Sequence, residues 1–176
     1  MNTTTPLRLL IIAAASICGA LMFRDFFAER IYVATASMEP TMPVNSRWWV
    51  DKVTLRLWGP AKGEVVVLAS PVNAEKGLIK RVIAVGGDTI EIRDKVVYIN
   101  GAQLQEKFVQ HTRADEILRG DNLEPLKVPD DHVFLMGDNR DESGDSRDWK
   151  DPKTGKPMYF IPIQQLRGRI LGVRTQ

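Results

Sequence analysis

The sequence predicts an all-β domain that follows a single N-terminal apolar helix. After residue 30, short strand-like runs of apolar residues are separated by turns rich in Gly, Pro, Asn and Asp. No later stretch carries the long 3.6-residue apolar periodicity of an amphipathic helix. We therefore expect many short strands in an irregular, multi-stranded antiparallel arrangement.

The composition is that of a folded protein. The chain has 176 residues, of which 44% are hydrophobic and 26% are charged, which fits one domain and a short appendage. A formal net charge of +2, with no basic stripe and interleaved aromatics, predicts no nucleic-acid partner. The one cysteine, Cys18, excludes an intrachain disulfide.

The apolar segment from Leu9 to Phe23 carries no charge, and Arg8 and Arg24 close it. As a helix it would span roughly 22 Å, short of the ~30 Å hydrocarbon core, although snorkelling arginines could extend it. A cleaved signal peptide, a permanent transmembrane anchor and a buried helix are the three interpretations. We favour the anchor, because residues 21–24 lack a small-residue cleavage site. The expected division is 1–30 for the anchor with its juxtamembrane segment and 31–176 for the domain.

The expected strands follow from apolar runs bounded by turns. A turn at Gly59-Pro60 separates the first two, and Asp94 lies in the turn of an expected hairpin. The segment from Gln103 to Pro129 is polar, so we expect an irregular connection there. The expected strands are Trp48–Lys52, Glu64–Leu68, Leu78–Val85, Thr89–Ile92, Val96–Ile99, His132–Met136 and Gly168–Val173.

Three segments carry the residues of a candidate catalytic site. They are Ser37-Met38-Glu39-Pro40-Thr41, the run from Lys80 to Asp88, and the run from Gly137 to Arg147. Together they resemble the conserved motifs of bacterial type I signal peptidases, which cut leader peptides from exported proteins. The motifs cover about a fifth of the chain. One departure is Gly86, which stands where the family usually has proline.

The resemblance implies a role for each matching residue. Ser37 is the expected nucleophile and Lys80 its base, and the oxyanion hole combines the Ser37 backbone N–H with the Thr35 hydroxyl. Ser143 is expected to hydrogen-bond and orient the lysine, while Asp145 and Arg147 pair to hold their loop. Met38 and Pro40 are expected to border the substrate cleft.

The lysine chemistry also has a basis in the sequence. A serine hydroxyl needs a base, and a lysine amine serves only when it is neutral. In a strand, Lys80 shares one face with Leu78 and Val82, whereas Ile79 and Arg81 point to the other. Aliphatic surroundings lower a lysine pKa, and a hydroxyl partner such as Ser143 adds no negative charge. Taken alone, Lys80 fits a surface position on an edge strand better than a catalytic one.

Other functions fit the sequence less well. A serine–histidine–aspartate hydrolase has only His111 and His132 to draw on, and neither lies in a recognisable motif. A calcium loop in the third segment would have Arg140 at a ligand position. A self-cleaving repressor would carry a DNA-binding module in place of the apolar segment. Two alternatives stay open: a specialised processing protease for conjugation or pilus proteins, and a non-catalytic membrane-anchored β interaction domain.

The expected function is therefore a membrane-anchored serine endopeptidase that removes signal peptides by a Ser37–Lys80 dyad. The resemblance implies a signal-peptidase-like β domain with no metal or organic cofactor. Its expected partners are preprotein signal peptides and the lipid bilayer. It also implies a single-pass protein of the plasma or inner membrane with the catalytic domain on the extracytoplasmic side, since the flanking charges do not choose a side. Trp48, Trp49 and Trp58 fit either a membrane interface or the core.

Overall fold

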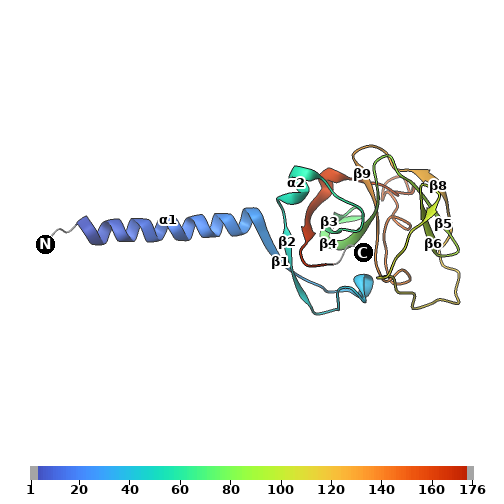
Figure 1. Ribbon diagram of the computed structural model, residues 1–176, viewed down its shortest axis with the longest axis horizontal. Helices are drawn as coiled ribbons and strands as arrows, with labels where there is room; N and C mark the ends of the chain where they lie inside the picture. The colour runs from blue at the N-terminus through green and yellow to red at the C-terminus, as the bar shows by residue number, and fades with distance from the viewer. Residues whose placement is uncertain (1–3, 174–176) are drawn as a thin grey trace.

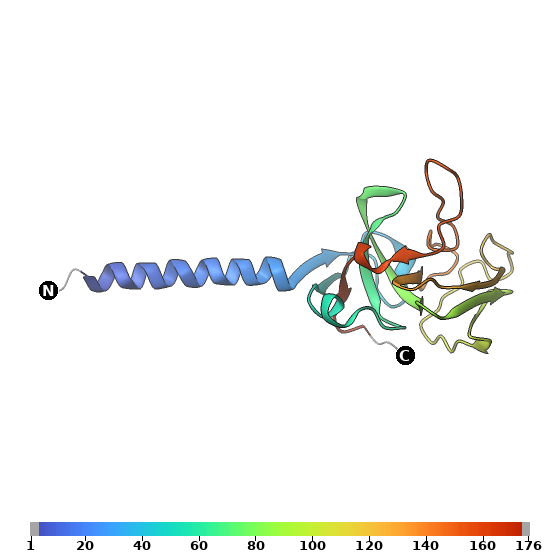
Figure 2. The ribbon, with the colours of Figure 1, turned by 90° about the horizontal axis from the view of Figure 1, so that it is seen from above.

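A long helix and a β domain make up the structure. The computed structural model describes residues 4–173, with the side chains of residues 6–19 and 29–173. Helix α1, Thr4–Phe27, extends away from one side of the domain in both views (Figures 1 and 2). Strand β1, Ala28–Tyr32, follows it directly and crosses residue 30. Within the part of the chain described here, no helix has both the length and the apolar character needed to cross a membrane.

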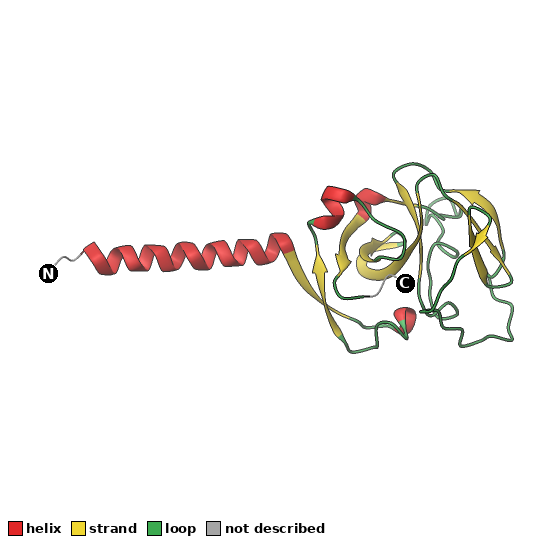
Figure 3. Cartoon of the chain, in the orientation of Figure 1, coloured by secondary structure: helices red, strands yellow, loops and turns green. Residues whose placement is uncertain are grey.

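Two antiparallel sheets form the domain (Figure 3). The larger has the order β1-β2-β11-β3-β4-β9-β10 and the smaller the order β7-β6-β5-β8. The prediction of an antiparallel all-β domain is confirmed, because every strand pair in the two sheets is antiparallel. The strands after β1 are β2 (Arg47–Asp51), β3 (Val65–Ser70), β4 (Asn73–Val85), β5 (Thr89–Arg93), β6 (Val96–Ile99), β7 (Ala102–Gln103), β8 (Leu123–Lys127), β9 (His132–Met136), β10 (Ile161–Pro162) and β11 (Leu166–Ile170). The short helices are η1 (Ala36–Met38), α2 (Thr54–Trp58) and η2 (Ile163–Gln165).

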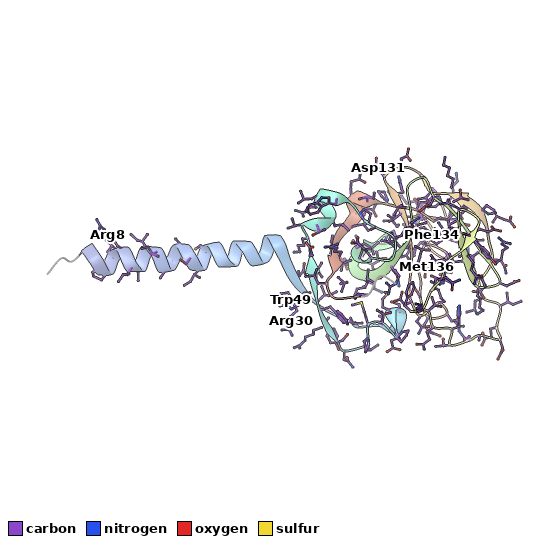
Figure 4. The ribbon with its side chains drawn as sticks, in the orientation of Figure 1. Arg8, Arg30, Trp49, Asp131, Phe134 and Met136 are labelled. Carbon is purple, nitrogen blue, oxygen red and sulfur yellow. The ribbon has the colours of Figure 1, made fainter. Side chains whose placement is uncertain are left out.

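Strand β4 is the centre of the packing, because its two faces and its neighbours contribute to three apolar clusters. Val82 packs with β3 and β9 in the first cluster, and Leu78 borders the same cluster. Ile83 packs with Phe134 and Met136 of β9 against the smaller sheet, and both β9 side chains lie inside the domain (Figure 4). A third cluster lies beneath the segment that follows β1. Burial of these apolar side chains is the main stabilising contribution to the domain.

Several local expectations need correction. The segment from Gln103 to Pro129 is not wholly irregular, because β7 ends in it and β8 pairs with β5. Strand β1 and helix α2 lie where the sequence predicted neither. The last strand is β11, Leu166–Ile170, two residues earlier than expected at its start.

The three tryptophans expected at a membrane interface or in the core differ in their exposure. Trp48 packs against the third apolar cluster, whereas Trp49 is half exposed and Trp58 is 75% exposed. The Arg30 guanidinium lies 5.9 Å from the Trp49 ring centroid, near the base of α1 (Figure 4). Neither a core position nor a shared surface therefore describes all three side chains.

Candidate active site

The segment with Ser37 is held from below by two buried methionines. Met38, in η1, and Met42 pack fully into the third apolar cluster. The Ser37 carbonyl oxygen accepts a hydrogen bond from the Asn139 backbone N–H at 3.1 Å. The Ser37 hydroxyl lies 3.4 Å from the Thr35 hydroxyl. Apolar burial and a contact to the third segment thus fix the loop while Ser37 itself stays partly accessible.

Pro40 and Met38 differ in their position relative to that loop. Met38 is 1% exposed and belongs to the floor beneath Ser37, whereas Pro40 lies on the surface after a cis Glu39–Pro40 bond. Met38 also lines the groove that contains Ser37, but Pro40 lines a different hollow, on the side of Trp48. The structure therefore places one of these two expected cleft residues beside Ser37.

Lys80 is a buried lysine in the middle of a sheet. It is 2% exposed, and its strand β4 lies between β3 and β9, so the surface interpretation is wrong. The Lys80 ammonium donates a hydrogen bond of 2.9 Å to the Ser143 hydroxyl. Burial lowers the pKa of Lys80 to about 8, and the negative charge of Asp145 only partly opposes this effect.

Behind Ser143 lies a buried carboxylate. The Ser143 hydroxyl donates to Asp145 Oδ2 at 2.8 Å, and the Arg147 guanidinium contacts both Asp145 oxygens at 2.9 Å. Burial by itself would raise the pKa of Asp145, but the Arg147 charge and hydrogen bonds outweigh it, and the pKa lies below its usual value. The expected ion pair of Asp145 and Arg147 is therefore formed. The Ser143 hydroxyl connects it to Lys80, because it accepts a hydrogen bond from the amine and donates one to Asp145.

Gly137 lies where the Ser37 loop approaches Ser143 of the third segment. A Cβ added there would overlap both the Ser143 hydroxyl and the Ser37 carbonyl oxygen. Only glycine leaves room for the Ser37 loop to approach Ser143 this closely. In the described residues, no hydrogen bond joins the Ser37 hydroxyl directly to the Lys80 amine.

A groove with a volume of about 390 Å³ leads to Ser37. One wall is β1 with the segment that follows it, and the other is the part of β4 from Gly77 to Ile79. Among the described residues, strand β1 pairs only with β2, and β9 pairs with β4 only from Arg81 onward. Both walls therefore present an unpaired strand edge to the groove, so an extended peptide could add hydrogen bonds to either.

Sequence reasoning missed the partners of Arg81. This residue is fully buried on the face of β4 opposite Lys80, and it forms an ion pair with Asp138 at 2.5 Å. The Phe108 ring lies 3.8 Å from the Arg81 guanidinium carbon. Two adjacent cationic residues on one strand were the signal in the sequence that could have pointed to buried partners. Those partners, Ser143 for Lys80 and Asp138 for Arg81, come from a distant part of the chain.

Comparisons with known proteins identify the family. The family model described as signal peptidase, peptidase S26, matches residues 5–173. The chain belongs to this family. A "Probable signal peptidase I-2" from Synechocystis is 36% identical over 156 residues, and the alignment covers 85% of this chain and 64% of that protein. A "Signal peptidase I P" from Bacillus subtilis subsp. natto is 32% identical, with 84% of each chain covered.

Among solved structures, a signal peptidase I from Enterococcus faecalis is 26% identical. The superposition covers 62% of this chain and 95% of that one, with a TM-score of 0.47. The peptidase S26 match runs through all three segments of the candidate site, from the Ser37 loop to Arg147.

Proposed function

We propose that this S26-family chain is a serine endopeptidase that removes N-terminal signal peptides from exported preproteins, with Ser37 as nucleophile and Lys80 as base. The observation that carries the proposal is the buried Lys80, whose low pKa and hydroxyl partner suit a neutral amine, close to a groove that contains Ser37. The relatives named signal peptidase I supply the substrate class.

The proposed reaction begins when the neutral Lys80 amine takes the Ser37 hydroxyl proton. Ser37 Oγ attacks the scissile carbonyl carbon, and the oxyanion accepts hydrogen bonds from the Ser37 backbone N–H and the Thr35 hydroxyl. The peptide C–N bond breaks as Lys80 returns the proton to the leaving amine. Lys80 then takes a proton from water as the water oxygen attacks the acyl carbonyl carbon; the ester C–O bond to Ser37 breaks, and Lys80 returns the proton to Ser37 Oγ.

Ser143, Asp145 and Arg147 orient the base in this proposal. The Ser143 hydroxyl accepts from Lys80 and donates to Asp145, which fixes the direction of the amine. Arg147 holds the Asp145 carboxylate in place. None of the three needs to contact the substrate, and no metal or organic cofactor enters the reaction as proposed.

The substrate is an extended leader-peptide segment lying between the two unpaired strand edges of the groove. The resemblance to type I signal peptidases implies small residues at the first and third positions before the cut. A protease specialised for conjugation or pilus proteins would use the same centre on other leaders, so the choice of substrate separates the two proposals.

We further propose that residues 1–30 anchor the catalytic domain, residues 31–176, in the plasma or inner membrane. Helix α1 extends beyond the domain (Figure 1), and the large apolar side chains described in it, among them Leu10 and Ile12, are exposed. Charged Arg8 and Arg24 bound the uncharged stretch between them. A single-pass anchor with the domain on the extracytoplasmic side would place the groove where leader peptides emerge.

Cleavage of a leader peptide with a small-x-small site, in detergent, tests the function. Wild type is compared with Ser37→Ala and Lys80→Arg, each checked for a native circular dichroism spectrum. We expect cleavage after the small residue by wild type and a loss of about 10³-fold or more in both variants. A wild type that cuts neither this peptide nor pilin-type leaders would favour a non-catalytic domain. Full activity in either variant would refute the assigned pair.

A further inference from the structure

The segment 104–110, which follows β7, is bound to the third catalytic segment. The Gln110 N–H donates to the Asp138 carbonyl at 2.9 Å, and the Arg140 N–H donates to the Gln110 carbonyl at 2.9 Å. The Phe108 ring of the same segment covers the Arg81 guanidinium. A stretch that looked like a passive connection therefore forms an outer support for residues 138–140.

Glu106 makes the strongest of these contacts. Its carboxylate accepts two hydrogen bonds from the Arg140 guanidinium, one of them 2.9 Å long. The Arg140 side chain is 1% exposed and that of Glu106 is 9% exposed. A bidentate pair of this kind is geometrically specific as well as strong, so it fixes the plane of the guanidinium.

Arg140 passes this support on to Gly137. Its Nε–H donates to the Gly137 carbonyl oxygen at 3.2 Å, and the Gly137 N–H donates to Asp145 at 3.1 Å. Both peptide groups of Gly137 are thus held by side chains. Since Gly137 is in contact with both Ser143 and the Ser37 carbonyl, its position sets the spacing between the nucleophile loop and the partner of Lys80.

We propose that Glu106 is a positioning residue for the Ser37–Lys80 centre, acting through Arg140 on Gly137. The inference rests on the proposed function. Without the Glu106 carboxylate, Arg140 is a buried cation that lacks its counter-charge, and it turns toward water. The Gly137 carbonyl then loses its donor, and Ser143 shifts with Lys80 relative to Ser37. A displacement of about 1 Å in such a centre can slow the reaction on the order of 10²-fold.

The test is a kinetic comparison of full-length Glu106→Gln with wild type on the same leader peptide. The matched control is Glu124→Gln, which removes the same charge from an exposed position on β8, a strand that pairs with β5 in the smaller sheet. We expect Glu106→Gln to lower kcat roughly 10- to 100-fold with KM within about twofold. Looser packing also admits water around Lys80, so the rising limb of the pH–rate profile moves to higher pH. The control variant keeps wild-type values.

A second variant separates positioning from folding. Glu106→Met combined with Arg140→Met removes both buried charges and refills the space with apolar atoms, so it folds even where Glu106→Gln does not. We expect this double variant to be folded yet as slow as Glu106→Gln. Wild-type kcat and an unshifted pH profile in either folded variant would overturn the inference.

The two proposals fail in different ways. If wild type cleaves nothing, or if Ser37→Ala cleaves as fast as wild type, the proposed function falls and the inference falls with it. If wild type cleaves and Ser37→Ala does not, while folded Glu106→Gln matches Glu124→Gln in kcat, only the positioning role is refuted. A loss of kcat that merely follows the folded fraction, with no change in the pH profile, also refutes it.

Discussion

Replacement of Lys80 by methionine should make the free energy of unfolding of the domain depend less on pH in the alkaline range. Lys80 is buried, and its pKa falls from 10.5 to about 8 in the folded chain. Between these two values the unfolded state binds a proton that the folded state does not. The free energy of unfolding therefore rises with pH across this window, and the penalty for the buried ammonium is fully present below pH 8. A pKa difference of this size corresponds to about 3 kcal/mol.

The assay is equilibrium denaturation of Ser37→Ala and of Ser37→Ala/Lys80→Met at pH 7 and pH 10.5, because Ser37→Ala prevents self-digestion. Other titrating groups act equally in both proteins and cancel in the difference. Asp145, which loses a nearby cation, titrates far below this range. We expect the stability advantage of the methionine variant to shrink by about 3 kcal/mol from the lower to the higher pH. An advantage that is the same at both pH values would refute the depressed lysine pKa.

Three further predictions concern the groups around the Lys80 amine. In Gly137→Ala, the added methyl group overlaps Ser143 and the Ser37 carbonyl. We expect the free energy of unfolding to fall by about 1–3 kcal/mol and kcat to decrease. Denaturation and peptide cleavage measure the two effects. In wild type, kcat/KM should rise with pH through a midpoint of about 8 as Lys80 becomes neutral. In Ser143→Ala the rate should fall and that midpoint should move upward, because Asp145 is no longer separated from the amine by a hydroxyl; an unmoved midpoint would contradict this.

Sequence patterns predicted the strands that are regular and central, and missed those that are irregular or at an edge. The alternation around Lys80 predicted its face correctly, since Leu78 and Val82 pack in one cluster. Strand β8 escaped notice because Pro125 interrupts its pattern, and proline is tolerated there only because β8 lies at the edge of the smaller sheet. Strand β1 is likewise an edge strand, with charged residues directly after the helix.

The supporting contacts of the site could not be predicted in the same way. Glu106 lies in a polar stretch with no periodicity, and Arg140 is 34 positions away. Nothing local distinguishes this carboxylate from Glu124, which is exposed. The pairing depends on how the segment after β7 folds back over the third catalytic segment, and that path is a property of the whole fold.

Lys80 and Arg81 illustrate why two adjacent cations on one strand serve opposite purposes. Both side chains are almost completely buried, on opposite faces of β4. Arg81 forms an ion pair directly with the Asp138 carboxylate, which suits a permanently charged guanidinium. Lys80 instead donates a hydrogen bond to the Ser143 hydroxyl, and the Asp145 carboxylate lies one hydrogen bond further away.

The Ser143 hydroxyl keeps the Asp145 carboxylate from contacting the Lys80 amine, whose pKa is lowered mainly by burial. A carboxylate in direct contact with Lys80 would stabilise the ammonium and oppose the effect of burial. With Ser143 between them, the Asp145 charge raises the pKa of Lys80 by less than burial lowers it. Ser143→Asp would therefore bring a carboxylate to Lys80, as Asp138 does for Arg81. We expect such a variant to fold with a protonated Lys80 and to lose activity near pH 8, with recovery only at higher pH.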